Sequence, residues 1–181
     1  MTKNEILVLL KEFNQLKKLF REGWLRYIDR KDCESVAEHC FMTALLSMFI
    51  KDKYFPKANI EKILRMALIH EAGEIYVGDI TPHDNISKEE KHKKEKEAVE
   101  LIFSNLSNGK NYISLWEEYE LGKTLEAQIV GWSDRLELAY QALIYEKNHE
   151  IDLQEFFDSV EGKITDEKVN KIFDEIKELR K

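Results

Sequence analysis

Apolar residues recur every three or four positions in the first part of the chain, the spacing of one face of an α-helix. Within residues 4–20 these positions are Ile6, Leu9, Leu10, Phe13, Leu16 and Phe20. The chain also contains only 7 glycines and 2 prolines among its 181 residues, whereas the two together average about 12% of a protein. Because a many-stranded β fold needs frequent turns, we predict an all-α fold.

Caps and apolar runs predict further helices. Ser35 and Glu38 form the S-x-x-E pattern of a capping box, which predicts a helix that begins there and continues through Ile50. Residues 21–34 keep no helical period and predict an irregular connection before it. The other predicted helices cover residues 59–76, 88–103, 112–119, 124–147 and 166–181, with Asn59 and Ser87 as N-caps and a turn between Gly78 and Pro82.

Composition restricts the domain organisation and the partners. With 43% hydrophobic residues, the chain can bury one core, so residues 1–181 are predicted to form a single domain. The net charge of −7 argues against extended DNA or RNA as a partner, because a phosphate backbone would be repelled. Residues 17–31 are an exception, since their six basic and two acidic residues could attract a small anion.

The cysteines and the apolar segments bear on the compartment. Cys33 and Cys40 provide no disulfide framework and no CxxC spacing, which favours buried thiols in a reducing cytoplasm. The first residues, MTKNEILVLLKEF, lack the features of a secretory signal, and no segment approaches 18 apolar residues without charges. We therefore expect a cytoplasmic protein that does not span a membrane.

Four polar residues stand in apolar helical surroundings, where a buried imidazole or carboxylate needs a partner. His39 lies in the first turn of its predicted helix, and His70 and Glu71 end the apolar run 66–69. Asp134 has apolar residues four positions before and after it. Each alone is compatible with a satisfied core polar group. Together, two imidazoles and two carboxylates suit a divalent metal that leaves positions open for water and substrate.

Two more carboxylates follow the His-Glu pair. Glu74 comes four residues after His70 and would share its helical face, as a general acid or base or a group that orients water. The alternative is a surface carboxylate near the helix end. Asp79 follows Gly78 at a turn, where it could simply cap the next segment. The zinc motif HExxH is excluded because residue 74 is a glutamate.

The remaining histidines and tryptophans have simpler interpretations. His83 could contribute to a second metal, although a loop histidine is the favoured interpretation, and His92 and His149 are expected at the surface. Trp116 and Trp132 are expected in the core or at a subunit interface.

The order of His39, the pair His70-Glu71 and Asp134 resembles the H…HD…D pattern of the HD-domain metal-dependent phosphohydrolases. Three segments are similar to those of 5′-deoxynucleotidases of the bacterial YfbR and animal HD-domain-containing protein 2 types. They are ESVAEH, HEAGEIYVGDITP and SDRLELAYQA. The phrases GDITPHDNISKEEKHKKEKEA and LWEEYE favour the second branch. The resemblance covers residues 12–148 and leaves residues 149–181 as a C-terminal helical extension.

The resemblance implies a helical HD-domain bundle that hydrolyses deoxyribonucleoside 5′-monophosphates to deoxynucleosides and phosphate. It also implies a homodimer and one divalent metal ion, which could be Mn, Co, Zn, Fe, Ni or Mg. Glu74 and Asp79 would take catalytic positions, with Asp79 near the substrate or its water network. Trp24 would lie against the nucleotide and favour deoxyribose over ribose. By position, the metal ligands would be His39, His70, Glu71 and Asp134.

Two departures from the family pattern matter. Glu71 replaces the aspartate of the His-Asp pair and is one methylene longer, so we expect weaker metal affinity, altered metal preference or an inactive site. Gly23 stands where the bacterial enzymes have an arginine, so Arg21 or Arg26 would bind the phosphate instead. The alternatives are therefore an HD-type hydrolase of another nucleotide ester or anhydride, and a non-catalytic nucleotide-binding module.

Overall fold

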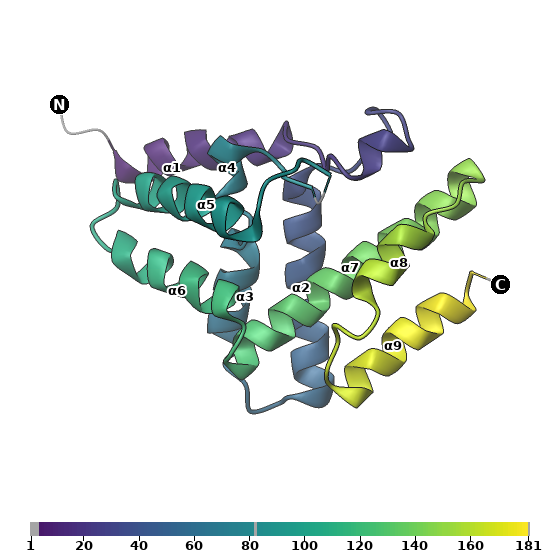
Figure 1. Ribbon diagram of the computed structural model, residues 1–181. Coiled ribbons are helices and arrows are strands. Elements are labelled where there is room, and N and C mark those ends of the chain that lie inside the picture. The colour runs from purple at the N-terminus through teal and green to yellow at the C-terminus, as the bar shows by residue number, and fades with distance from the viewer. Residues whose placement is uncertain (1–3, 82, 181) are drawn as a thin grey trace.

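The computed structural model describes residues 4–81 and 83–180, which form a helical bundle (Figure 1). Within these ranges no strand forms, apart from an isolated bridge between Phe20 and Ser35. The all-α prediction is confirmed. The helices are α1 (Glu5–Phe13), α2 (Val36–Tyr54), α3 (Ile60–Ile69), α4 (Glu74–Val77), α5 (Lys88–Phe103), α6 (Gly109–Leu121), α7 (Leu125–His149), α8 (Gln154–Val160) and α9 (Glu167–Glu178), with 3₁₀ turns at Asn14–Lys17 and Trp24–Arg26.

Helices α2, α3 and α7 pack together at the centre of the molecule, with α5 and α6 on one side and α8 and α9 on the other (Figure 1). Buried apolar residues such as Ile63, Met66 and Val130 fill the central core. A second cluster, which includes Val99 and Trp116, joins α5 and α6 to the end of α3. Consequently, polar groups on the three central helices can meet inside the bundle.

The capping box at the start of α2 forms as predicted. The Ser35 hydroxyl accepts from the Glu38 backbone N–H at 3.3 Å, and the Glu38 carboxylate accepts from the Ser35 N–H at 2.7 Å. The Glu38 carboxylate also accepts from the Ser35 hydroxyl at 2.7 Å, and the hydrogen bonds from the Ser35 N–H and hydroxyl lower the pKa of Glu38. The bridge between Phe20 and Ser35 closes residues 21–34 into an ordered connection, in which Trp24 is buried.

The prediction of one helix over residues 59–76 is wrong beyond Ile69, because the helix breaks at His70. In an uninterrupted helix the Glu74 N–H would donate to the His70 carbonyl. Here that carbonyl accepts from Trp116 Nε1 at 3.0 Å, and the Glu74 N–H donates to the Glu71 carbonyl at 3.1 Å. Glu74 therefore begins α4 and does not share a helical face with His70. Asn59 caps α3 as predicted.

Gly73 lets the turn at residues 70–73 approach α5 closely. A Cβ atom at this position would lie 2.7 Å from Cβ and 3.0 Å from Cα of Glu95. Because such contacts would displace α5, the turn that carries Glu71 requires a residue without a side chain.

Other boundaries also differ from the predictions. The first helix ends at Phe13 and continues only as a 3₁₀ turn, and α6 begins at Gly109 instead of residue 112. Helix α8 was not predicted, since its seven residues are too few to reveal a period. Pro82 and Lys181, which belong to a predicted turn and helix, lie outside the described residues. The described helices include none that is both long and apolar enough to cross a membrane.

Candidate metal centre

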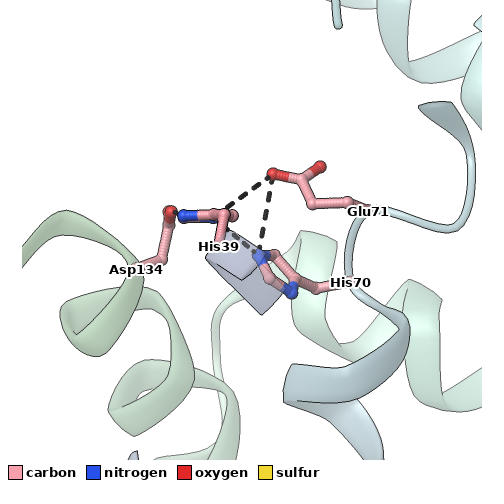
Figure 2. Close-up of side chains that lie close together, drawn as sticks. All are labelled: His39, His70, Glu71 and Asp134. Carbon is pink, nitrogen blue, oxygen red and sulfur yellow. Dashed lines mark hydrogen bonds and ion pairs between the residues drawn. The ribbon is translucent and has the colours of Figure 1, made fainter. Parts of the chain in front are cut away.

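His39, His70, Glu71 and Asp134 point toward one another from α2, the end of α3 and α7 (Figure 2). His39 Nε2 lies 3.2 Å from Asp134 Oδ1 and 3.8 Å from Glu71 Oε1. His70 Nε2 lies 3.6 Å from Glu71 Oε1 and 3.3 Å from His39 Nε2. One possible ligand atom from each residue falls within 4.8 Å of all the others. The extra methylene of Glu71 does not keep its carboxylate away from the cluster.

The opposite nitrogen of each imidazole is already engaged. His70 Nδ1 lies 2.7 Å from the Ala67 carbonyl oxygen, which can only accept, so this nitrogen carries the proton. His39 Nδ1 lies 2.6 Å from Glu137 Oε2, and an ionised carboxylate likewise accepts. Both contacts leave Nε2 as the nitrogen that can bind a metal, the arrangement found at histidine-metal sites.

Glu137 is a functional candidate that the sequence analysis missed. It lies three residues after Asp134 in α7 and therefore on the same face of that helix. Its side chain is buried, which is uncommon for a glutamate. The three-residue spacing between Asp134 and Glu137 within SDRLELAYQA was the sequence signal that could have identified it.

The electrostatics favour ionised carboxylates around the histidines. Burial and Arg21 both lower the pKa of His39, but hydrogen bonds to Asp134 and Glu137 outweigh them and raise it to about 10. Burial opposes ionisation of Glu71, yet His70 and Arg21 lower its pKa. Burial also opposes ionisation of Asp134, whose pKa His39 lowers. Two buried imidazoles beside two partly exposed carboxylates fit a divalent cation with nitrogen and oxygen ligands.

Arg21 is the arginine that reaches the cluster. Its Nη1 atom lies 3.3 Å from Glu71 Oε1 and 3.9 Å from Asp79 Oδ1. Asp79 Oδ2 accepts from the Glu22 backbone N–H at 2.7 Å, so this carboxylate holds the 21–34 connection and does not cap the segment after it. Arg26 pairs with Glu155 at 3.2 Å, with both side chains 43% exposed.

Glu74 is buried, so its interpretation as a surface carboxylate is wrong. Only 1% of the residue is exposed, and Oε2 has no hydrogen-bond partner among the described residues. Burial, together with Glu71 and Asp79, raises its pKa well above the ordinary value. These surroundings therefore disfavour the ionised form of Glu74.

A cavity of about 380 Å³ adjoins the cluster, a size typical of small-molecule sites. Trp24 contributes to its wall, with the indole stacked on Phe156 and Nε1 donating to Glu34 at 2.8 Å. Arg21 and Asp79 line both the cavity and the edge of the cluster. The complete lining is Arg21, Gly23, Trp24, Arg26, Asp79, Thr81, His83, Leu138, Glu155, Phe156 and Ser159.

His83, His92, Trp116 and Trp132 are not members of the four-residue cluster. His83 lines the cavity and belongs to neither group of possible metal ligands among the described residues. His92 stacks on Trp116 and contacts Glu120. Trp116 and Trp132 are buried in the core. Trp116 thus supports the site indirectly, through the His70 carbonyl.

We predict that Glu137→Gln weakens Mn²⁺ binding about 10- to 100-fold, because the neutral amide loses the charge that orients His39. Isothermal titration calorimetry measures the affinity, and circular dichroism checks the fold. Glu126→Gln at the start of the same helix is the matched control and should change the affinity less than twofold. Unchanged Mn²⁺ affinity in Glu137→Gln would contradict the assigned contact.

The comparisons with known proteins agree with this geometry. The family model described as HD domain matches residues 13–177. The zebrafish protein named 5′-deoxynucleotidase HDDC2 is 40% identical over 164 residues, covering 88% of this chain and 80% of its own. The human protein of the same name is 37% identical over 179 residues, covering 97% and 86%.

A solved structure shares the fold. A structure described as a conserved hypothetical protein from Pyrococcus furiosus has a TM-score of 0.79 and 29% identity, covering 95% of this chain and 97% of its own. The family match spans most of the chain and includes all four clustered residues. This chain belongs to the HD-domain family.

Proposed function

We propose that this protein is a metal-dependent 5′-deoxynucleotidase, which converts deoxyribonucleoside 5′-monophosphates to deoxynucleosides and phosphate. The observation that carries the proposal is the convergence of two imidazole nitrogens and two carboxylate oxygens within 4.8 Å beside a cavity. The zebrafish and human relatives, both named 5′-deoxynucleotidase, support the substrate class. The proposed metal ligands are His39, His70, Glu71 and Asp134.

A divalent ion held by these ligands would lower the pKa of a bound water and offset charge on the phosphoryl oxygens. Arg21 would bind the phosphate, because its guanidinium borders both the cluster and the cavity and can donate two parallel hydrogen bonds. Asp79 holds the backbone beside Arg21. Through this contact Asp79 would position Arg21 toward the phosphate and the water network around the phosphate.

Glu74 is the proposed proton donor. Burial raises its pKa and so favours the protonated carboxyl, and its unpartnered Oε2 has no competing hydrogen bond among the described residues. A neutral carboxyl group next to a phosphate ester can protonate the departing 5′ oxygen of the deoxyribose. This transfer would prevent the release of an unstable alkoxide.

Trp24 is the proposed contact to the sugar. Its indole is fixed by the hydrogen bond to Glu34 and by stacking on Phe156, with a ring-centroid separation of 4.0 Å. A rigid wall of this kind cannot move aside for an additional hydroxyl group. We therefore propose that Trp24 favours deoxyribose over ribose.

Two alternatives remain distinct from this function. The site could hydrolyse another nucleotide ester or anhydride, or the chain could bind nucleotides without turnover. Glu71 and Gly23 motivate the second alternative, because both depart from the family pattern. Against it, Glu71 Oε1 lies within the cluster and Arg21 is available beside it.

A substrate panel decides among these functions. We expect phosphate release from deoxyribonucleoside monophosphates with Mn²⁺ or Co²⁺, and at least tenfold lower kcat/KM for the matching ribonucleotides. His70→Ala should abolish both turnover and bound metal, because it removes a ligand, while the helical circular dichroism stays intact. Release from none of the substrates with Mn²⁺, Co²⁺, Mg²⁺ or Zn²⁺ would reject the enzyme. Nucleotide binding in calorimetry without release would support the non-catalytic module.

Glu71→Asp tests the departure in the His-Glu pair. Restoring the shorter side chain should strengthen Mn²⁺ binding and raise kcat/KM about tenfold if the longer glutamate weakens the coordination. Glu71→Gln, which keeps the length and removes the charge, should lower both. Lower metal affinity in Glu71→Asp would show instead that this site has adapted to glutamate.

We also propose that the protein is a cytoplasmic homodimer. Helix α2 is apolar on its outer side as well as its inner one, with Phe41 61% and Phe49 56% exposed. A helix that is apolar all round is normally covered on both sides. A second copy related by a two-fold axis would bury this face against itself. The free cysteines Cys33 and Cys40 support a reducing compartment.

Sedimentation velocity tests the dimer. The protein should sediment at twice the monomer mass, and the double variant Phe41→Glu with Phe49→Glu should sediment as a monomer, because paired α2 faces would bury four charges. Leu121→Glu, at an exposed position on α6, is the control and should remain dimeric. A native protein that is monomeric at micromolar concentration would contradict the proposal.

A further inference from the structure

Helix α8 contributes to the cavity from a part of the chain beyond the motifs of the metal centre. Glu155, Phe156 and Ser159 all line it. The approach depends on Gly23, because a Cβ atom there would lie 3.3 Å from Phe156 Cε1. Phe156 also stacks on Trp24 with an interplanar angle of 28°. The C-terminal segment therefore completes an aromatic wall of the cavity.

Glu155 places a carboxylate on this wall. Its Oε1 atom accepts from the Tyr27 hydroxyl at 2.9 Å and from Arg26 Nη1 at 3.2 Å. His83 Nε2 lies 3.9 Å from the same oxygen. These contacts fix the carboxylate, although its side chain is 43% exposed. None of these partners belongs to the metal cluster.

The charges in the cavity determine how a nucleotide would enter it, provided that the proposed function is correct. The phosphate must lie at the cluster, where Arg21 provides a positive charge. Arg26, the other arginine of the cavity lining, is already paired with Glu155 at 3.2 Å. The nucleoside therefore extends toward Glu155. There the Trp24 and Phe156 rings provide an apolar wall for a base, and the carboxylate can only accept hydrogen bonds.

We propose that Glu155 is a specificity-determining residue that accepts a hydrogen bond from an amino group of the nucleobase. Adenine and cytosine present an exocyclic amino group at the edge where guanine and thymine present a carbonyl oxygen. A carboxylate facing that carbonyl would place two acceptors together. The cavity therefore favours dAMP and dCMP over dGMP and dTMP.

Steady-state kinetics of Glu155→Gln test this assignment. Glutamine keeps the shape and still offers an oxygen to Tyr27, but it removes the charge and adds a donor that can face thymine. We expect kcat/KM to fall about tenfold for dAMP and dCMP. For dTMP it should rise severalfold, because the amide nitrogen can donate to the thymine carbonyl. For 2-deoxyribose 5-phosphate, which lacks a base, it should change less than twofold. The native enzyme should prefer dAMP to dTMP about tenfold.

Asp158→Asn is the matched control, since Asp158 lies on α8 outside the cavity lining and should leave every rate within twofold. An equal loss for all four substrates in Glu155→Gln, 2-deoxyribose 5-phosphate included, would overturn the proposal and indicate a structural role. Unchanged rates for dAMP and dCMP would overturn it too, while leaving the deoxynucleotidase function intact. If the native protein hydrolyses none of these compounds, the proposed function fails and the role of Glu155 fails with it.

Discussion

The hydrogen bond between Glu137 and His39 Nδ1, at 2.6 Å, fixes the imidazole on which the candidate metal centre depends. His39 is fully buried, and its other ring nitrogen faces Asp134, Glu71 and His70. Rotation of this ring would therefore disturb its contacts with all three other members of the cluster. Because a buried imidazole and carboxylate are costly without partners, the arrangement commits α2 and α7 to one relative position. The capping box at Ser35 fixes the start of α2 just before His39.

Features encoded by neighbouring residues could be predicted from the sequence. The capping box needs only Ser35 and Glu38, which are three residues apart, and it forms as expected. The break at His70 could not be predicted in this way, because its cause is the indole of Trp116, 46 residues further along the chain. The Met66–Ile69 run continues the helical period up to the break, so local pattern alone favours a longer helix. The burial of Glu74 follows from that same break.

The basic segment 17–31 shows why net charge is a poor guide to a site. Its six basic residues suggested a local attraction for anions, but they do not act together. Arg30 lies over the Phe20 ring, and Lys31 pairs with neighbouring aspartates. Among the described residues, Arg21 is the one of the six that contacts the carboxylates of Glu71 and Asp79. The bridge between Phe20 and Ser35 holds the chain next to Arg21, whose guanidinium contacts Glu71.

The departure at Gly23 has a physical counterpart far along the chain. A side chain at this position would meet Phe156, so the glycine and the aromatic residue of α8 depend on each other. The bacterial enzymes that the sequence resembles have an arginine at this position. Glycine here lacks that charge and leaves room for the Phe156 ring against Trp24. That exchange brings residues beyond 148 into the wall of the candidate site. Under the proposed function, the nucleoside would meet this apolar wall, and Arg21 beside the cluster would bind the phosphate.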